Sequence, residues 1–384
     1  MRVDADDFAR PCSCGREHHI DVKEIVIESG AIGKLEEEMS DGDLREYISP
    51  LLICDTNSYK ATEELMEDIY DRCQVLILDA EGLEADDRAV EIVENYMEED
   101  IDLVLAVGAG TIHDLSRFVA HQYRIPFVSV PTAASSDGFT STVADMTWNG
   151  VKKTVAASAP LFVFADTDIF AKAPKRLTAA GVSDILGKYI ALADWKIASI
   201  LSEEYYCAEV VNLETRAVRT VKDNLKEIAA GEEEACEKLM YALVLSGLAM
   251  QMTGSSRPAS GAEHHLVHLW DMEVVNGHLD ALHGEKVSGG TMLVLLEYKK
   301  IADAIRRGTC KVHTCTEEDQ ELLKETFGKK GILGALEKEN TPEPLDDVST
   351  RELSDALPRI LKIIDALPAV TDMQEMMNTA GCVS

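Results

Sequence analysis

The alternation of short apolar segments with amphipathic ones, from the N-terminus to Ala165, most limits what this chain can fold into. The apolar segments have the length of β-strands, and stretches between them, such as Ala61–Tyr70 and Arg88–Met97, predict helices. Buried strands separated by helices are typical of a parallel sheet that is covered on both faces. Six strands are predicted: Glu24–Ile27, Leu51–Cys54, Val75–Leu78, Leu103–Val107, Phe127–Val130 and Leu161–Ala165.

Two further segments, Thr140–Thr147 and Val151–Ala156, predict a hairpin, because the Asn-Gly between them is a strong signal for a tight turn. After Pro174 helical patterns replace the strand patterns. From Val182 to Leu201 apolar residues recur at helical spacing, and Leu239–Met252 is almost wholly apolar, as in a fully buried helix. We therefore predict an α/β domain with a Rossmann-like parallel sheet over residues 1–168. An all-helical domain follows over residues 169–384, with the site in the cleft between the two.

The chain is strongly acidic, with a formal net charge of −32 at pH 7. Such a charge disfavours broad contact with nucleic acid or an anionic membrane surface, so an anionic ligand would need a local cluster of donors. No apolar run reaches the ~18 residues of a membrane span, and the N-terminus lacks the pattern of a targeting segment. We expect neither nucleic-acid binding nor membrane insertion.

The nine cysteines are scattered over the chain, and their odd number predicts reduced thiols in the cytoplasm rather than a disulfide scaffold. Cys12-Ser-Cys14 with His18 and His19 could bind a metal. The spacing is too short for a standard zinc finger, however, and no second cysteine pair follows nearby. We therefore expect a local turn ahead of the first strand, with a structural zinc site as the alternative.

A glycine-rich turn, Gly108-Ala-Gly110-Thr111, follows the strand Leu103–Val107. Glycines let the backbone approach a pyrophosphate, and free N–H groups at a helix start favour anions. The six-residue dinucleotide fingerprint is not met, because His113 occupies its last glycine position. Thr111 and Asp114 also have the spacing of a capping box for a helix that begins at Thr111. Cofactor contact and helix capping are both open interpretations here.

A second loop, Pro-Thr-Ala-Ala-Ser-Ser-Asp-Gly over residues 131–138, follows the strand Phe127–Val130. Its small hydroxyl residues suit donation to phosphate or carboxamide oxygens, and they equally suit an ordinary turn. Asp55, after the strand Leu51–Cys54, can accept hydrogen bonds from a ribose, although an aspartate at a strand end more often forms a turn.

One aspartate and several histidines in the helical half have the chemistry of a metal site. His264 and His268 are four residues apart and share a helix face, and His283 follows in His-Gly-Glu-Lys. Asp184 lies upstream, near the expected start of a helix, where an acidic residue would also stabilise the helix dipole. One carboxylate and two imidazoles can hold a divalent metal and leave positions open for substrate. His265 is a competing ligand, because it is three residues from His268.

At these residues the chain resembles the sn-glycerol-1-phosphate dehydrogenases, a family within the superfamily of iron-type alcohol dehydrogenases, glycerol dehydrogenases and dehydroquinate synthases. The match runs from about Ile20 to Ile301. The Ser-Arg-Pro-Ala-Ser-Gly run over residues 256–261 is the most discriminating motif, because it resembles the glycerol-phosphate branch. The other motifs are Gly-Ala-Gly-Thr-Ile-His-Asp114, Pro-Thr-Ala-Ala-Ser-Ser-Asp-Gly138, Gly-Val-Ser-Asp184 and His-Gly-Glu-Lys286.

The resemblance implies a role for each matching residue. Asp184, His264 and His283 would be the ligands of a divalent zinc or nickel ion. His268 and Asp137 would be the catalytic residues that contact substrate beside the nicotinamide, with Asp184 also close to substrate. NAD(P)H would lie against Asp55, Gly108, Gly110, Thr111, Ile112, His113, Asp114, Thr132, Ala133, Ala134, Ser135 and Ser141.

The implied reaction is the reversible, metal-dependent reduction of dihydroxyacetone phosphate to sn-glycerol 1-phosphate by NAD(P)H, a step of phospholipid biosynthesis, in a homodimer or higher homo-oligomer. The substrate phosphate needs cations in an acidic protein. We expect Arg257 to supply one, with Lys153 and Lys286 behind it, although Arg257 can instead tie its loop to an acidic neighbour. The alternatives are a glycerol dehydrogenase-like polyol oxidoreductase, a phosphate-eliminating dehydroquinate synthase-like enzyme and a catalytically silent binding protein.

Overall fold

The structure of the protein is a computed structural model that describes residues 2–4, 8, 11–314, 317–342 and 345–382. Seven strands form one sheet in the order β1-β2-β9-β6-β5-β3-β4, in which β1 is antiparallel to β2 and the other neighbours are parallel. The predicted parallel sheet is thus confirmed. The strands are β1 (Arg2–Asp4), β2 (Glu24–Glu28), β3 (Pro50–Asp55), β4 (Gln74–Leu78), β5 (Leu103–Gly108), β6 (Phe127–Pro131) and β9 (Phe162–Asp166).

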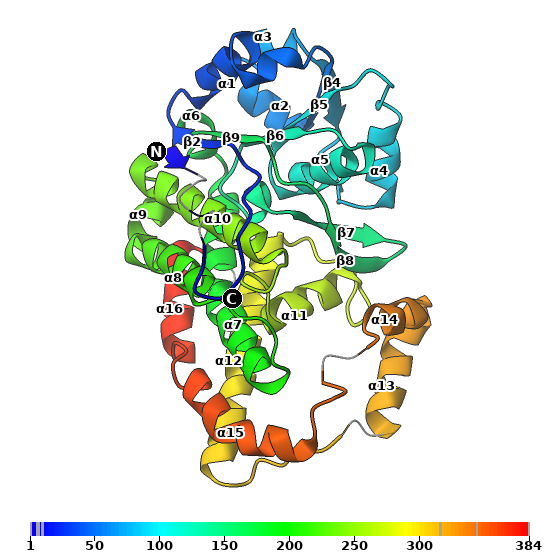
Figure 1. Cartoon of the computed structure of the whole chain (residues 1–384), viewed down its shortest axis with the longest axis vertical. Coiled ribbons are helices and arrows are strands. Elements are labelled where there is room, and N and C mark those ends of the chain that lie inside the picture. Colours follow the sequence, from blue (N-terminus) through cyan, green and yellow to red (C-terminus); the bar gives the residue numbers. More distant parts are fainter. Residues whose placement is uncertain (1, 5–7, 9–10, 315–316, 343–344, 383–384) are drawn as a thin grey trace.

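Helices cover both faces of this sheet (Figure 1). Along β3, Leu52 and Cys54 join the buried cluster beneath the first helices, while Leu51 and Ile53 join the cluster beneath α4 and α5. Burial on both faces explains why the strands are continuous apolar runs rather than alternating ones. The helices are α1 (Ala31–Ser40), the short 3-10 helix Asp43–Glu46, α2 (Thr56–Thr62), α3 (Glu67–Tyr70), α4 (Asp87–Glu94) and α5 (Gly110–Tyr123).

One predicted helix, Ala61–Tyr70, is wrong in its extent, because α2 ends at Thr62 and α3 begins at Glu67. Asp55 starts α2 early by accepting hydrogen bonds from the N–H groups of Asn57 and Ser58. The short helix that results is complete before the amphipathic pattern ends.

The predicted hairpin is confirmed as β7 (Val143–Trp148) and β8 (Val151–Ala156), which pair antiparallel. Asn149 and Gly150 have φ angles of 51° and 77°, as a two-residue turn with both central residues left-handed requires. The first strand begins later than predicted because Gly138–Thr140 forms a 3-10 turn. The hairpin extends from the sheet half toward the helical half (Figure 1).

After β9 the described residues form helices joined by loops, as predicted. The longest of these helices, α7, begins at Lys175, just after Pro174 and seven residues before Val182, where the predicted apolar pattern starts. The helices are α6 (Thr167–Phe170), α7 (Lys175–Leu201), α8 (Ala208–Asp223), α9 (Leu225–Ala230), α10 (Glu233–Thr253), α11 (Ala262–Asp271), α12 (His283–Arg306), α13 (Glu317–Phe327), α14 (Leu333–Glu339), α15 (Thr350–Ile364) and α16 (Val370–Ala380), with a 3-10 turn at Gly328–Lys330.

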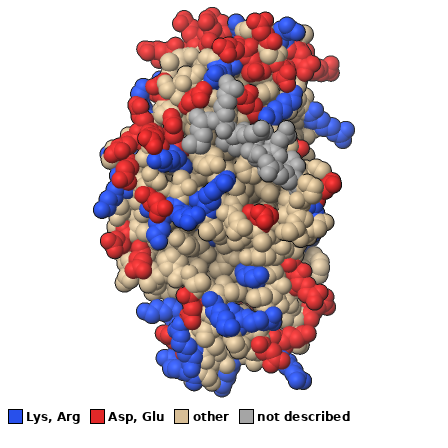
Figure 2. Space-filling model, turned by 60° about the vertical axis from the view of Figure 1, so that its left-hand side comes forward, with Lys and Arg blue, Asp and Glu red and all other residues tan. Residues whose placement is uncertain are grey.

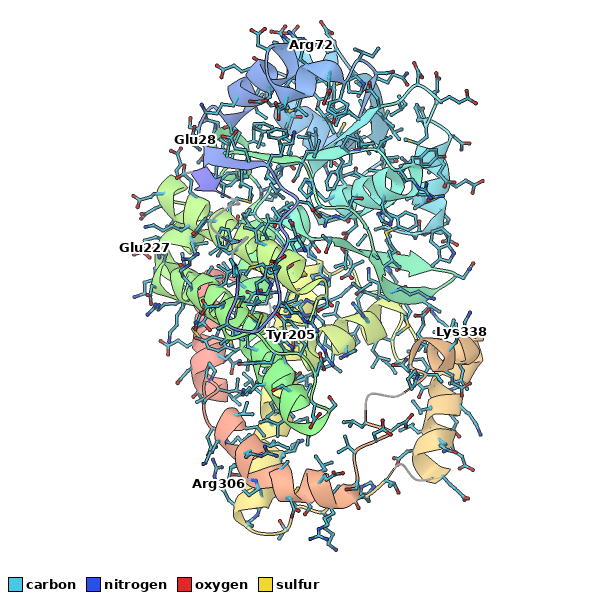
Figure 3. The ribbon with its side chains drawn as sticks, in the orientation of Figure 1. Glu28, Arg72, Tyr205, Glu227, Arg306 and Lys338 are labelled. Atoms are coloured by element: carbon cyan, nitrogen blue, oxygen red, sulfur yellow. The ribbon has the colours of Figure 1, made fainter. Side chains whose placement is uncertain are left out.

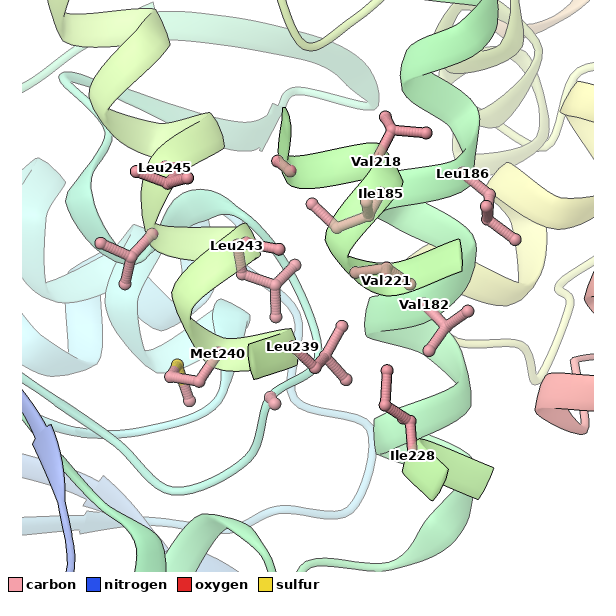
Figure 4. Close-up of a cluster of buried hydrophobic side chains, with 14 of the residues drawn as sticks. Val182, Ile185, Leu186, Val218, Val221, Ile228, Leu239, Met240, Leu243 and Leu245 are labelled. Atoms are coloured by element: carbon pink, nitrogen blue, oxygen red, sulfur yellow. The ribbon is translucent and has the colours of Figure 1, made fainter. Parts of the chain in front are cut away.

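The largest buried cluster lies between α7, α8 and α10, where Ile185, Val218 and Leu243 pack together (Figure 4). The same cluster includes Ile25 of β2 and Phe139 of the loop after β6. The two predicted domains therefore share a core, which holds the loop after β6 against α7. The predicted boundary after residue 168 falls inside α6 and stays a prediction.

Helix α14 packs beside the hairpin, away from α15 and α16. Ile332, just before α14, shares a small buried cluster with Val151 of β8 and Met272 at the end of α11. Figure 3 labels Lys338 on α14 at this side of the molecule and Arg306, the last residue of α12, at its lower end.

Acidic side chains gather at the upper end of the face shown in Figure 2, which belongs to the sheet half. Lysines and arginines are interspersed lower on that face, as in a solvated surface of mixed charge. Among the described residues, no helix combines the length and apolarity needed to span a membrane.

Candidate functional site

Asp184, His264 and His283 converge from three helices, α7, α11 and α12. Each offers one ligand atom, and these atoms lie within 4.8 Å of one another. His264 Nε2 is 3.3 Å from His283 Nε2 and 3.7 Å from Asp184 Oδ1. His265, the competing ligand, is exposed and lies outside this group. The structure therefore brings together the three side chains that the family resemblance implied as metal ligands.

Asp184 does not lie near the start of its helix, so the expected helix-dipole interpretation is wrong. Helix α7 begins nine residues earlier, at Lys175, and Asp184 is fully buried. Its Oδ1 accepts a 2.7 Å hydrogen bond from Lys188, and its Oδ2 accepts one of 3.0 Å from the Asp137 N–H. Burial acts to raise the pKa of Asp184, but the charges of Lys188 and the two histidines outweigh it and lower the pKa. The carboxylate is thus ionised and ready to bind a cation.

Glu263 fixes the orientation of the His264 ring. Its Oε1 lies 2.7 Å from His264 Nδ1 and also accepts the Gly261 N–H. With Nδ1 donating to this carboxylate, Nε2 carries a lone pair toward Asp184 and His283, as in carboxylate–histidine–metal arrangements. Burial opposes protonation, yet the bond to Glu263 raises the pKa of His264 overall. The donor set and its support fit a divalent metal ion with three protein ligands.

The glycine and the glutamate of the His-Gly-Glu-Lys motif each have a structural reason. A Cβ on Gly284 would lie 2.0 Å from the Ala180 carbonyl oxygen, so only glycine lets α12 approach α7 there. Glu285 accepts the Leu282 N–H and two bonds from Arg176, which fix the start of α12. His283, the first residue of that helix, is held in place as a result.

The glycine-rich turn connects β5 to α5. The helix begins at Gly110, with Ala109 as its N-cap and no side-chain cap, so the predicted Thr111–Asp114 capping box is wrong. Because Gly110 is already helical, Thr111 lies within the first turn and cannot act as its cap. A Cβ on Gly108 would lie 2.7 Å from the side chain of Ile112, so the turn needs glycine there. The first N–H groups of α5 have no acceptor inside the helix, and unpaired N–H groups at a helix start favour anions.

His113 is engaged entirely within the protein. Its backbone N–H donates to the Ala109 carbonyl. Its ring Nδ1 lies 2.9 Å from the same oxygen, and its ring Nε2 lies 2.8 Å from Ser129 Oγ. Burial lowers the pKa of His113 to about 3, so the ring is neutral. Its side chain shapes the turn from behind rather than facing the space in front of it.

The other predicted cofactor residues lie near the same carboxyl ends of the central strands. From β3 the chain adds β4 on one side and then crosses over to add β5 on the other side. The direction in which strands are added therefore reverses between β3 and β5. Ligands of open α/β sheets bind at the carboxyl ends of strands at such a reversal. Asp55 ends β3 but uses Oδ1 to cap α2, which is the turn-forming role. Four loop residues and Ser141 are buried beside these strand ends: Thr132, Ala133, Ala134, Ser135 and Ser141.

Comparison with known proteins identifies the family. A model described as iron-containing alcohol dehydrogenase matches residues 26–174. A glycerol-1-phosphate dehydrogenase (NAD(P)+) of Geobacillus stearothermophilus is 34% identical over 97% of this chain and 87% of its own length. This chain belongs to the glycerol-1-phosphate dehydrogenase family. The relative of the same name in Methanosarcina mazei is 32% identical over 80% of this chain and 85% of its own.

Solved structures extend the likeness at the level of the fold. Glycerol dehydrogenase from Schizosaccharomyces pombe superposes with a TM-score of 0.59 at 19% identity, covering 92% of this chain and 91% of its own. The sheet followed by a helical half is thus the fold that this chain shares with that dehydrogenase.

Several charged residues beside the metal cluster were missed from the sequence. Lys188 is fully buried, with Nζ 2.8 Å from Asp137 Oδ2 and 2.7 Å from Asp184 Oδ1. Burial acts to lower its pKa, but the carboxylates of Asp137 and Asp184 raise the pKa overall. The four-residue spacing from Asp184 could have revealed this partner.

A buried hydrogen-bonded chain continues beyond Asp137. Ser246 Oγ lies 2.8 Å from Asp137 Oδ2 and 2.9 Å from Glu214 Oε1. Burial raises the pKa of Glu214 to about 8, so this carboxyl is largely protonated near neutral pH. A protonated Glu214 donates to Ser246, whose hydroxyl then donates to Asp137. No spacing in the sequence signals this chain, because it joins α8, α10 and the loop after β6.

His268 lies one turn after His264 on α11 and faces the hairpin. Its Nε2 is 3.8 Å from Asp145 Oδ2 on β7. Lys152 on β8 donates to the Asp145 carbonyl oxygen at 3.1 Å, so a cation also lies at this end of the site. Lys153, which the sequence suggested, is bonded to Glu339 instead. Neighbouring strand residues point to opposite faces, which separates the two lysines.

The remaining cations suggested for the phosphate each have an acidic partner. Arg257 makes two bonds of 2.7 Å with Glu204, which is the alternative structural role. Lys286 lies 2.6 Å from Asp271 Oδ1, and Lys152 lies 3.9 Å from the other oxygen of that carboxylate.

Proposed function

We propose that this protein catalyses the reversible reduction of dihydroxyacetone phosphate to sn-glycerol 1-phosphate with NAD(P)H. The observation that carries the proposal is the convergence of Asp184, His264 and His283 in a chain that is 34% identical to a glycerol-1-phosphate dehydrogenase over 97% of its length. The product is a glycerol phosphate of the kind that phospholipid biosynthesis uses.

Asp184, His264 and His283 hold one divalent metal ion, which is zinc or nickel. When bound, the ion supplies a Lewis acid that polarises the substrate carbonyl and stabilises the negative charge that develops on its oxygen. Glu263 keeps His264 in the ligating tautomer, and Lys188 balances the charge of Asp184 from the protein side. Elemental analysis of the purified protein identifies the metal.

The nicotinamide cofactor binds at the carboxyl ends of the strands β3, β5 and β6. The turn from Gly108 to Ile112 presents N–H groups to its pyrophosphate, with Asp114 and the 132–135 loop beside it. Asp55 lies at the end of β3, where its carboxylate would disfavour a 2′-phosphate. This placement favours NADH over NADPH.

Asp137 and His268 contact the substrate from opposite sides of the site. Asp137 is held by Lys188 and Ser246, so its carboxylate has a fixed position for a substrate hydroxyl. His268 gives a proton, directly or through a water, to the oxygen of the reduced carbonyl, and Asp145 orients its ring. Lys152, on the strand β8 that pairs with the strand of Asp145, binds the phosphate. Arg257 positions its loop through Glu204.

The protein works as a homo-oligomer, a dimer or larger, in the cytoplasm. Leu293 and Leu296 are 47% and 42% exposed on the outer side of α12 and offer an apolar contact surface. None of the described cysteines forms a disulfide, in keeping with a reducing compartment. Light scattering on the purified protein measures the mass of the assembly.

A substrate comparison tests the proposed function. Purified protein should oxidise NADH with dihydroxyacetone phosphate and leave unphosphorylated dihydroxyacetone almost unused, and a chiral assay should find sn-glycerol 1-phosphate. Preference for dihydroxyacetone would instead identify a polyol dehydrogenase. Release of inorganic phosphate without net NADH oxidation would identify an eliminating synthase, and no turnover by metal-loaded protein would indicate a silent binding protein.

A further inference from the structure

A second cluster of ligating side chains lies away from Asp184, His264 and His283. Cys12, Cys14, His18 and Cys207 each offer one atom, and all four atoms lie within 4.8 Å of one another. Cys12 Sγ is 3.5 Å from Cys207 Sγ, while His18 Nε2 is 3.5 Å from Cys207 Sγ and 3.6 Å from Cys14 Sγ. Three sulfurs and one nitrogen thus face a common centre.

These separations match the edges of a zinc coordination tetrahedron. With zinc–sulfur distances of about 2.3 Å and zinc–nitrogen distances of about 2.0–2.1 Å, two sulfur ligands of a regular tetrahedron lie ~3.8 Å apart, and a sulfur and a nitrogen ligand lie ~3.5–3.6 Å apart. The observed separations of 3.5 and 3.6 Å leave room for one such ion. Three cysteines and one histidine are a common ligand set of closed, structural zinc sites.

The surrounding protein supports each kind of ligand. His18 is buried, and its Nδ1 lies 2.6 Å from the Met252 carbonyl oxygen, so Nδ1 donates and Nε2 presents a lone pair to the sulfurs. Cys207 is buried at the N-cap of α8, and this position fixes its sulfur beside His18 Nε2. The Tyr205 hydroxyl, 3.2 Å from Cys14 Sγ, can donate to that sulfur.

The expected local turn is present and presents the first two cysteines. The Gly15 N–H donates to the Cys12 carbonyl at 3.0 Å, and Gly15 has a φ of 83°, which favours glycine. Pro11 and Glu17 form an antiparallel bridge across this turn. The turn and the metal site, which the sequence offered as alternatives, are therefore compatible.

We propose that Cys12, Cys14, His18 and Cys207 bind a structural zinc ion, distinct from the metal held by Asp184, His264 and His283. All four positions of the tetrahedron are filled by protein, so no position is open for substrate.

This zinc would fasten the N-terminal segment to the helices that carry the active site. Met252, at the end of α10, precedes the loop that leads to α11 and His264. Tyr205, labelled in Figure 3, follows Glu204, and Glu204 holds Arg257 of the same loop. Losing the zinc would free the segment before α8 and loosen the start of α11 through Arg257.

Metal counting distinguishes the two clusters. The full-length protein is prepared with reductant and without chelator, and zinc is measured by mass spectrometry. Substitution of both Cys12→Ser and Cys14→Ser should lower zinc by about one equivalent per chain. Cys310→Ser, which changes a half-buried free thiol outside the cluster, is the matched control and should leave the metal content unchanged. His264→Ala should keep the zinc that the double variant loses.

Cobalt loading of the unaltered protein tests the site without relying on a variant that folds. Cobalt bound by three thiolates gives an intense sulfur-to-metal charge-transfer absorption, whereas cobalt bound by Asp184, His264 and His283 has no sulfur ligand. We expect this absorption in the unaltered protein and in His264→Ala. Its absence from cobalt-loaded protein would overturn the proposal. A Cys12–Cys207 disulfide in zinc-replete, freshly purified protein would overturn it as well, because the bonded sulfurs could not bind zinc.

Discussion

The molecule contains two clusters of ligating side chains with similar spacing and different chemistry. In both, the ligand atoms lie within 4.8 Å of one another, and in both a histidine Nδ1 is bonded by the protein so that Nε2 faces the cluster. At the helical junction, Glu263 holds His264. At the N-terminus, the Met252 carbonyl holds His18.

What differs is the rest of the ligand set and its neighbours. Asp184, His264 and His283 give three oxygen and nitrogen ligands, with the buried charge of Lys188 and the partly buried carboxylate of Asp137 beside them. The N-terminal cluster gives four ligands, three of them sulfur, and no carboxylate. A site with three ligands leaves a position for substrate, while a site with four does not. The comparison teaches that open coordination and nearby charge, rather than ligand spacing, distinguish the proposed catalytic cluster from the N-terminal one.

The largest expected effect comes from removing a ligand of the open cluster. His264→Ala should lower activity by about 10³-fold or more, because losing the Lewis acid removes several kcal/mol of transition-state stabilisation. Its neighbour His265→Ala, which changes an exposed side chain outside the cluster, is the matched control. Steady-state NADH oxidation and metal content are measured on the same samples. Near-normal turnover by metal-free His264→Ala would remove the basis for calling this cluster catalytic.

The second prediction concerns Lys152, the cation that we propose binds the substrate phosphate beside Asp184, His264 and His283. Lys152→Ala should raise KM for dihydroxyacetone phosphate by about 10–100-fold, because a charge-assisted hydrogen bond contributes ~1.5–3 kcal/mol. The KM for NADH should change little. Lys153→Ala, on the opposite face of the same strand, is the control. Equal changes in both Michaelis constants would argue that Lys152 only positions Asp145, and a selective effect of Arg257→Ala would move the phosphate to that residue.

The third prediction concerns Glu263, whose carboxylate accepts from His264 Nδ1, whereas a backbone carbonyl accepts from His18 Nδ1 in the N-terminal cluster. Glu263→Gln keeps the size of the side chain but removes the charge, and should weaken metal affinity by about 10–100-fold. Glu273→Gln, on the protein surface, serves as the control. Competition with a chelator gives the dissociation constants. Unchanged metal affinity in Glu263→Gln would show that the hydrogen bond does not tune the ligand.

The sequence predicted the elements and the ligands far better than it predicted their surroundings. Spacing and residue chemistry indicated a metal site but left His265 and His268 open as ligands, and the resemblance to the sn-glycerol-1-phosphate dehydrogenases selected Asp184, His264 and His283. The start of α7 was misplaced because Pro174, its N-cap, offers no side-chain cap as a signal. The predicted Thr111–Asp114 capping box was wrong because a glycine turn and a capping pattern overlap at the same few residues. The structure follows the glycine turn, so α5 begins at Gly110.

Partners that come from distant elements could not be read from one chain. Glu214, Ser246 and Asp137 meet only through packing of α8 and α10 on the loop after β6. Likewise Cys207 lies 195 residues from Cys12, so the N-terminal pair looked too short for a zinc site until the fold supplied the remaining ligand. Lys152 and Lys153 are indistinguishable in sequence until the hairpin register assigns each a face.

A third histidine gives the smallest expected effect and completes the comparison. His113, like His264 and His18, has Nδ1 bonded by the protein, but its Nε2 faces the Ser129 hydroxyl rather than a ligand cluster. Burial lowers its pKa to about 3, whereas the unfolded chain has the ordinary value of 6.5. As the pH falls below 6.5 the unfolded state binds a proton that the native state excludes, so stability is lost between pH 6.5 and about 3.

His113→Gln removes this titration and should make the acid loss of stability shallower. One pKa unit corresponds to ~1.4 kcal/mol, so the free energy of unfolding should fall by about 2 kcal/mol less than in the unaltered protein between pH 6.5 and pH 5. Urea unfolding at several pH values measures the difference in slope. The exposed His121→Gln is the control and should leave the slope unchanged. Identical slopes for His113→Gln and the unaltered protein would mean that His113 can be protonated in the fold, and would return it to the cofactor-facing side of the turn.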